Sequence, residues 1–260
     1  MESALWISKT GLSAQDTKLG IISNNLANVS TTGFKKDRPV FQDLFYQISR
    51  QPGGQSSQNT VLPSGVQQGT GVRMVATQKV FSTGNLQVTD QPLDLAINGR
   101  GFLQVQMPDG NIGYTRDGQL QMDASGQLVT SGGLVIQPVI SIASNVAHIT
   151  IGTDGTVSTT DANGATTQVG QLQLADFSNP AGLEAQGDNL FKATTASGDA
   201  IIGTATVNGM GNVIQGSIEN SNVNVVEELV NMIATQRAYE MNSKVISTVD
   251  QMLQYTVQNN

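Results

Sequence analysis

The sequence is poor in the residues that carry most enzyme chemistry. It has no cysteine and one histidine, His148, among 260 residues. Without cysteine there is no disulfide, no thiolate nucleophile and no zinc site of the usual cysteine and histidine kind. His148 lies in a run that alternates like a strand, with no nucleophile motif beside it, so a serine hydrolase is not indicated. We therefore expect neither a metal nor another cofactor.

Long apolar runs are also missing. No stretch of 18 apolar residues occurs, so the sequence predicts no membrane-spanning helix. Lys9, Asp16 and Lys18 interrupt any apolar run near the start, and we expect no cleaved signal peptide. The formal net charge is −7. This acidic balance does not favour nucleic acid as a partner.

The sequence contains only weak motifs for binding a small molecule. The glycine pairs at residues 99–101 and 209–211 lack the third glycine of a dinucleotide-binding loop, so we expect no small-molecule substrate. Four aspartates leave one enzyme class open, because glycoside hydrolysis requires a pair of carboxylates. Most of them adjoin glycine or proline, as turn residues do. A periplasmic wall-acting enzyme stays as an alternative, and its candidate residues are Asp94, Asp109, Asp117 and Asp123.

Both ends of the chain have the pattern of long helices. Leucines near the start recur every seven residues, which keeps one helix face against a partner. Residues 222–260 contain no glycine or proline, and Asn222 or Asn224 can cap the helix start. Apolar residues there fall on two lines, which predicts neighbours on more than one side. The predicted assembly residues are Leu5, Leu12, Leu19, Ile22, Leu26, Leu229, Met232, Tyr239, Ile246 and Leu253.

The middle of the chain has a different pattern. Residues 31–70 are predicted to form an extended connector, with a polar loop at residues 51–60. Residues 71–221 have short apolar runs separated by Asp-Gly and Asn-Gly turns, which are typical of β-hairpins. We therefore predict an α+β fold. Helices in residues 1–30 and 222–260 pair as a discontinuous, coiled-coil-like unit, and the β-rich domain is inserted between them.

A short basic cluster follows the first predicted helix. It consists of Lys35, Lys36 and Arg38. The cluster is either a solvated loop or a contact to acidic residues of a neighbouring chain, and the sequence leaves both interpretations open.

Motifs at both ends and in the middle resemble the bacterial flagellar rod and hook proteins. The match covers essentially the whole chain, in order. Length and the connector at residues 47–63 are most similar to the distal-rod members, and proximal-rod or hook subunits are the alternatives. The matching segments are residues 21–28 (IISNNLAN), 32–35 (TGFK), 98–103 (NGRGFL), 114–118 (YTRDG), 230–233 (VNMI) and 236–240 (QRAYE).

This resemblance implies a structural subunit without an active site. Family members stack helically into a hollow tube, with the paired terminal helices at the inner wall and the β domain outside. The distal rod crosses the periplasm of the flagellar basal body as a drive shaft and transmits torque to the hook. The implied partners are further copies of the chain, the proximal rod and hook proteins, and the ring proteins at the peptidoglycan and outer membrane. The flagellar export apparatus passes such chains without a cleaved signal.

Overall fold

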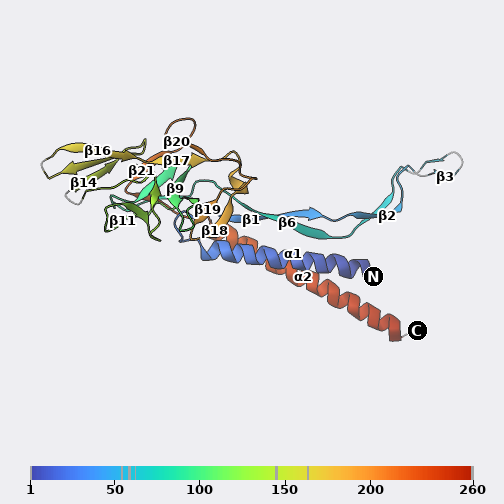
Figure 1. Ribbon diagram of the computed structural model, residues 1–260. Coiled ribbons are helices and arrows are strands. Elements are labelled where there is room, and N and C mark those ends of the chain that lie inside the picture. The colour runs from blue at the N-terminus through green and yellow to red at the C-terminus, as the bar shows by residue number, and fades with distance from the viewer. Residues whose placement is uncertain are drawn as a thin grey trace. The chain divides into compact units, whose positions relative to one another are not determined.

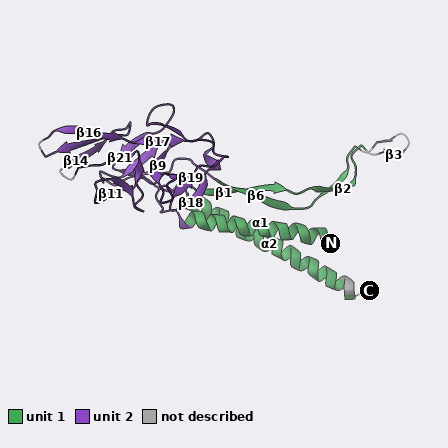
Figure 2. Cartoon of the chain, viewed as in Figure 1, with its two compact units in different colours: residues 1–26, 37–78, 224–260 green, residues 27–36, 79–223 purple. Residues whose placement is uncertain are grey.

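The computed structural model describes residues 2–53, 55–57, 60–61, 63–143, 146–162 and 164–258. The chain begins with helix α1 (Glu2–Ala27) and ends with helix α2 (Val225–Gln258), and strands lie between them (Figure 1). This order confirms the predicted α+β fold. The chain divides into two compact units (Figure 2). Unit 1 holds residues 1–26, 37–78 and 224–260, and unit 2 holds residues 27–36 and 79–223.

The predicted connector forms a long ribbon of paired strands in unit 1 (Figure 1). Strand β1 pairs with β6, β2 with β5, and β3 with β4. Because β6 pairs with β1, the β-rich unit begins at residue 79 rather than at residue 71. In the predicted polar loop, residues 54, 58 and 59 lie outside the described residues. The strands are β1 (Asp37–Asp43), β2 (Tyr46–Arg50), β3 (Gln55–Ser57), β4 (Thr60–Val61), β5 (Val66–Gly69) and β6 (Val72–Lys79).

Helix α2 begins at a side-chain cap, as predicted. The Oδ1 atom of Asn224 accepts hydrogen bonds from the backbone N–H groups of Val226, at 3.0 Å, and Glu227, at 3.3 Å. These are among the backbone donors that a helix start leaves without intrahelical partners. Glu227 and Glu228 place negative charge in the first turn, which suits the positive end of the helix dipole.

Small and polar side chains occupy the contact between α1 and α2. A Cβ atom at Gly11 would lie 3.1 Å from the side-chain nitrogen of Asn242, so the two helices meet there. Thr235 and Val249, seven positions to either side of Asn242, are 1% and 5% exposed. Gln15 lies on the facing helix, and its buried Oε1 atom has no hydrogen-bond partner among the described residues. The repeat of seven is therefore present on α2, and two of its three residues, Thr235 and Asn242, are polar.

Unit 2 is built on an antiparallel sheet that has seven strands among the described residues. Its order is β18-β19-β10-β9-β17-β20, with β13 also paired to β9. Unit 2 also contains a three-stranded sheet, β14-β15-β16, and three two-stranded sheets, β11-β12, β8-β21 and β7-β22. The bounds are β7 (Leu86–Val88), β8 (Leu95–Asn98), β9 (Phe102–Gln106), β10 (Ile112–Thr115), β11 (Leu120–Met122), β12 (Leu128–Thr130), β13 (Ile136–Gln137), β14 (Val146–Ile151), β15 (Thr156–Asp161), β16 (Thr166–Gln171), β17 (Gln173–Asp176), β18 (Glu184–Gly187), β19 (Leu190–Lys192), β20 (Ile201–Thr204), β21 (Asn212–Gln215) and β22 (Ser217–Glu219), with a 3₁₀ turn at Pro180–Gly182.

Two hydrophobic clusters hold unit 2 together. The larger is aliphatic and includes Leu95, Leu103, Val157 and Leu174, all of which are almost fully buried. The smaller is aromatic. Its rings meet edge to face, with centroids 4.8 to 6.0 Å apart, which is the favourable geometry for aromatic pairs. The aromatic residues are Phe81, Phe102, Tyr114, Phe177 and Phe191.

Candidate functional site

Three segments that are far apart in the sequence meet at a buried group of charges in unit 2. Lys35 Nζ donates to Glu219 Oε1 at 2.6 Å, although the two residues are 184 positions apart. Arg116 Nη1 lies 3.3 Å from the other carboxylate oxygen, Glu219 Oε2. The three side chains are between 0% and 3% exposed. We call Lys35, Arg116 and Glu219 the ion network.

Backbone groups complete the ion network. Lys35 Nζ also donates to the carbonyl of Ser82 at 2.8 Å, and Arg116 Nη2 donates to the carbonyl of Gly99 at 2.7 Å. The N–H of Gly84 donates to Glu219 Oε1 at 2.8 Å. Two cations share one carboxylate here, so the carbonyl dipoles supply part of the compensation that buried charges require.

The network is closed to solvent, and this sets its electrostatics. Burial lowers the pKa of the Lys35 ammonium, an effect that the Glu219 carboxylate opposes and the Arg116 charge adds to. Burial likewise lowers the pKa of Arg116, against the opposing effect of Glu219. The Arg116 guanidinium lies 5.3 Å from the centre of the Phe102 ring, so the ion network contacts the aromatic cluster. Because its three side chains are closed to solvent, the network stabilises the fold and is not accessible to a substrate.

A glycine permits the close approach of two of these segments. Gly33 has a φ of +71°, and a Cβ atom there would lie 2.7 Å from the carbonyl carbon of Arg116. No side chain fits at that distance, and positive φ favours glycine. The Gly33 N–H also donates to the backbone carbonyl of Glu219 at 2.8 Å. The TGFK and YTRDG segments therefore pack directly against each other, and their cations, Lys35 and Arg116, both pair with Glu219.

The structure corrects the interpretation of the basic cluster. Lys35 is neither in a solvated loop nor at a contact with another chain, because it is buried against Glu219 of its own chain. Arg38 is exposed and donates to the Gln78 side chain at 3.0 Å. Sequence reasoning missed Glu219 altogether. Its one signal is an acidic residue in the short strand β22, whose other two residues, Ser217 and Ile218, are buried.

The four candidate aspartates serve local structure. Asp109, Asp117 and Asp123 each accept a hydrogen bond from the backbone N–H two residues further on, at 2.8 to 3.1 Å. This is the turn geometry that their neighbouring glycines indicated. Asp94 accepts from the Thr89 hydroxyl at 2.6 Å. The only histidine, His148, lies exposed on strand β14, as its alternating run predicted.

Asp117→Asn is expected to raise the melting temperature at pH 7. Burial raises the pKa of Asp117 above its ordinary value of 3.8, and the nearby Asp94 charge adds to the effect. The folded state then binds the proton more tightly than the unfolded state, so stability falls as pH rises from 3.8 through the raised pKa. The asparagine does not ionise, so this loss of stability disappears, and its side-chain oxygen can still accept the hydrogen bond from the Gln119 N–H. Thermal unfolding at pH 7 and pH 3 checks this, and the gain should disappear at pH 3.

Asp154→Asn is the matched control for this measurement. Hydrogen bonds from the Thr156 hydroxyl, at 2.6 Å, and from its N–H, at 3.1 Å, lower the pKa of Asp154. The same change should therefore lower the melting temperature at pH 7. A shift of the same sign in both variants would contradict the assignment.

The predicted assembly residues lie on α1 and α2 with unequal exposure. Ile22 is buried. Leu229 and Tyr239 are exposed. The remaining ones are half-buried, and they are Leu5, Leu12, Leu19, Leu26, Met232, Ile246 and Leu253.

Helix α2 exposes more apolar surface than these positions account for. Its exposed apolar side chains have exposed fractions of 38% to 72%. Adjacent apolar side chains exposed on this scale mark an interaction surface. Val226, Val230 and Ile233 lie on the side of the helix away from the buried Thr235, and Val245 lies one turn from Asn242, with more than two fifths of each of these apolar side chains exposed. We call it the α2 apolar band, and it consists of Val226, Leu229, Val230, Ile233, Met241 and Val245.

Among the described residues, neither α1 nor α2 nor any other helix combines the length and the apolar character that crossing a membrane requires. Within that part of the chain, no three metal-ligating side chains come together.

Comparisons with known proteins identify the same three regions that form the ion network. Residues 5–35 match a family model described as flagella basal body rod protein. Residues 96–159 match the D1 domain of flagellar hook protein FlgE/F/G, and residues 214–259 match the C-terminal region of flagellar basal body rod FlgEFG protein. Lys35, Arg116 and Glu219 each come from a different one of these regions.

Similar proteins cover nearly the whole chain. The flagellar basal-body rod protein FlgG of Buchnera aphidicola subsp. Schizaphis graminum is 59% identical over 256 residues, 98% of each chain. FlgG of Borreliella burgdorferi is 45% identical over 97% of each chain. The flagellar hook-basal body complex protein FlhP of Bacillus subtilis is 32% identical over 97% of each. From these matches and the fold, the chain belongs to the family of flagellar basal-body rod and hook proteins.

Proposed function

We propose that this chain is the structural subunit of the distal flagellar rod. Copies stack helically into a hollow shaft that transmits torque from the motor to the hook. The observation that carries the proposal is the α2 apolar band, which a single chain leaves exposed. The identity of 45% to 59% with proteins named FlgG supports the rod assignment.

Burial of the α2 apolar band supplies a driving force for stacking. Removing the exposed half of six large apolar side chains from water contributes on the order of 5–9 kcal/mol per subunit. Association costs roughly 4–15 kcal/mol in lost motion, so one such contact is marginal. In a helical stack each subunit has several neighbours, and the predicted residues on α1, such as Leu12 and Leu19, add to the same contacts.

The ion network suits a part that bears torque. The chain leaves unit 2 twice, after residue 36 for strand β1 and after residue 223 for helix α2. Lys35 and Glu219 lie within a few residues of these two exits and are joined to each other. The network therefore ties both exits to Arg116 in the core of unit 2.

The remaining elements of the proposal follow from the family. The subunit has no active site and takes no cofactor, nucleic acid or small-molecule substrate. Its partners are copies of itself, the proximal rod and hook proteins, the rings at the peptidoglycan and outer membrane, and the export apparatus. It lies in the part of the basal body that crosses the periplasm, and it is exported without a cleaved signal peptide.

Two alternatives are less well supported. A proximal-rod or hook subunit would share the family and differ in its place along the axis, but the FlgG relatives are more similar than FlhP. A wall-acting enzyme would need carboxylates free for catalysis, whereas Asp109, Asp117 and Asp123 accept backbone hydrogen bonds in turns.

Expression of this chain in a bacterium that lacks its own distal rod protein tests the assignment. We expect restored motility, and a density map of the basal body should show the subunit in the distal rod. The double variant Asp94→Asn/Asp117→Asn should restore motility equally well. Subunits found only in the proximal rod or the hook would refute the assignment, and loss of wall cleavage in the double variant would favour the enzyme.

A further inference from the structure

A groove in unit 1 lies between helix α1 and strand β6, and we call it the α1 groove. Its volume is about 420 Å³. Trp6 and Met74, two of its lining residues, are 54% and 41% exposed, so the groove presents large apolar surface to solvent. Two exposed cations, Lys9 and Arg73, also line it, and among the described residues no acidic one does. Lys9 Nζ lies 5.4 Å from the centre of the Trp6 ring, so cation and indole form one surface.

The helix and the strand are in contact at this groove. The N–H of Val72 donates to Thr10 Oγ1 at 3.4 Å. Gly71 has a φ of +122°, and a Cβ atom there would overlap the Thr10 hydroxyl oxygen. Positive φ favours glycine, and the missing side chain lets the ribbon come this close to α1. The α1 groove is therefore present in the single chain before any partner binds.

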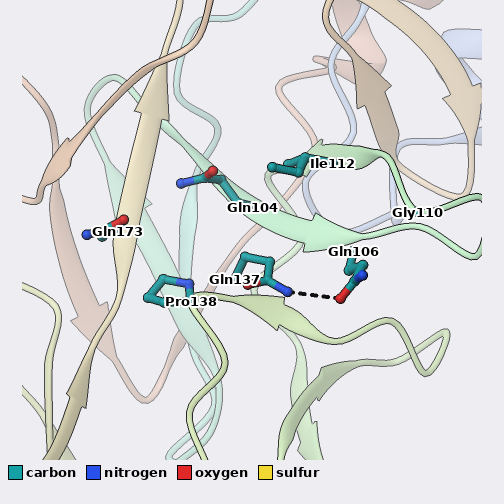
Figure 3. A pocket seen from close by; sticks show the side chains of 7 residues that line it. All are labelled: Gln104, Gln106, Gly110, Ile112, Gln137, Pro138 and Gln173. Atoms are coloured by element: carbon teal, nitrogen blue, oxygen red, sulfur yellow. Dashed lines mark hydrogen bonds between the residues drawn. The ribbon is translucent and has the colours of Figure 1, made fainter.

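A second cleft, on the main sheet of unit 2, has a different chemistry (Figure 3). The described residues that line it are uncharged, and Gln137 Nε2 donates to Gln106 Oε1 at 3.0 Å (Figure 3). Such a lining does not distinguish one class of ligand from another. The α1 groove is more selective, because it combines an exposed indole ring with two cations.

The first turns of α2 have the complementary character. These turns, residues 225–236, contain two glutamates and no lysine or arginine. Val226, Val230 and Ile233 lie on one side of them and are 70%, 61% and 52% exposed. The three side chains span about two helical turns, or roughly 10 Å. The exposed Glu227 adds a negative charge beside them.

We propose that the α1 groove binds the first turns of α2 from a second copy of the chain. Val230 and Ile233 fill the apolar part of the groove, and Glu227 lies near its two cations. Opposite charges of this kind select which segment docks and fix its register. Groove and segment are different surfaces, so the contact is head-to-tail and can repeat along a rod. This inference rests on the proposed function, and it names the surface that receives the α2 apolar band.

The α2 helix of the same chain does not offer its first turns to the groove. Gly11, which lies between the lining residues Lys9 and Ser13, meets Asn242 of that helix. Ile233 is nine positions from Asn242, which is about 14 Å along the helix. The segment that fits the α1 groove must therefore come from another copy.

Disulfide trapping tests the contact, because the chain has no cysteine of its own. The double variant Ser13→Cys/Val230→Cys places one thiol in the groove and one on the docked segment, both at exposed positions. Mild oxidation of the assembled protein should link successive copies into a ladder of covalent oligomers on a non-reducing gel. Ser13→Cys/Ser243→Cys is the matched control, since Ser243 is exposed on α2 outside the docked segment. It should give no ladder.

Reversing one charge of the groove tests its chemistry. Arg73→Glu should raise the critical concentration for assembly about tenfold, because it places like charges at the contact. Adding Glu227→Lys to Arg73→Glu should recover most of this loss. Arg38→Glu, at an exposed arginine on β1 outside the groove, should assemble like the unchanged protein.

Three results would contradict the inference, and they differ in what else they affect. Normal assembly of Arg73→Glu, with no ladder from Ser13→Cys/Val230→Cys, would overturn the contact and leave the rod assignment standing. Cross-links that stop at the dimer would show a symmetric contact instead of a head-to-tail one. An unchanged chain that never assembles would contradict the proposed function and this contact with it.

Discussion

Glu219→Gln is expected to lower the free energy of unfolding by about 3–5 kcal/mol, the cost of leaving buried charge without its partner. The substitution keeps the shape of the side chain and removes its charge. Lys35 and Arg116 then remain buried with only carbonyl groups and the new amide as partners. Urea denaturation, followed by the circular dichroism signal of the strands, measures the loss.

Lys35→Met is the matched control, because it removes a charge from the same place and leaves Arg116 and Glu219 as a balanced pair. Its expected loss is smaller, about 1–3 kcal/mol, since the carbonyl of Ser82 loses its shorter hydrogen bond, at 2.8 Å, and keeps the one from Asn222, at 3.3 Å. The test is which of the two variants loses more free energy of unfolding. If Glu219→Gln unfolds no more easily than Lys35→Met, the carboxylate is not the centre of the network.

Ile233→Asp is expected to prevent polymerisation while the monomer keeps its stability. Ile233 is 52% exposed in the single chain, so the monomer should change by less than about 0.5 kcal/mol, as surface substitutions usually do. In the rod that we propose, the same side chain is buried against a neighbouring subunit. A charge buried there without a partner costs about 3 kcal/mol or more, which raises the critical concentration roughly 100-fold.

Sedimentation of the assembled material and thermal unfolding of the monomer measure these two effects separately. Ser243→Asp adds the same charge at an exposed polar position of α2 and should assemble at nearly the normal concentration. Leu253→Asp, at a predicted assembly residue, should behave like Ile233→Asp. Normal polymers from Ile233→Asp would show that the α2 apolar band is not an assembly surface.

Local sequence determined the elements of this fold and their order. Asn224 is a helix cap wherever it precedes an uninterrupted helical run, because its side chain reaches its own helix's N–H groups. Asp109 and Asp123 likewise make turns with the residues that follow them. Both partners of each of these hydrogen bonds lie within a few positions of each other, so the local sequence is enough to predict them.

The tertiary structure decided which of these residues meet. Periodicity placed a repeat of seven on both helices, but it did not show that the small Gly11 meets the polar Asn242 where α1 and α2 approach each other. Lys35 and Glu219 are 184 positions apart, and only the pairing of strands brings them to 2.6 Å. The residue Gln104 is 3% exposed for the same reason, since β10, β13 and β17 pair with the two edges of β9. Burial and charge pairing depend on residues that are distant in the sequence and close in the fold, and a local sequence pattern does not predict which residues these are.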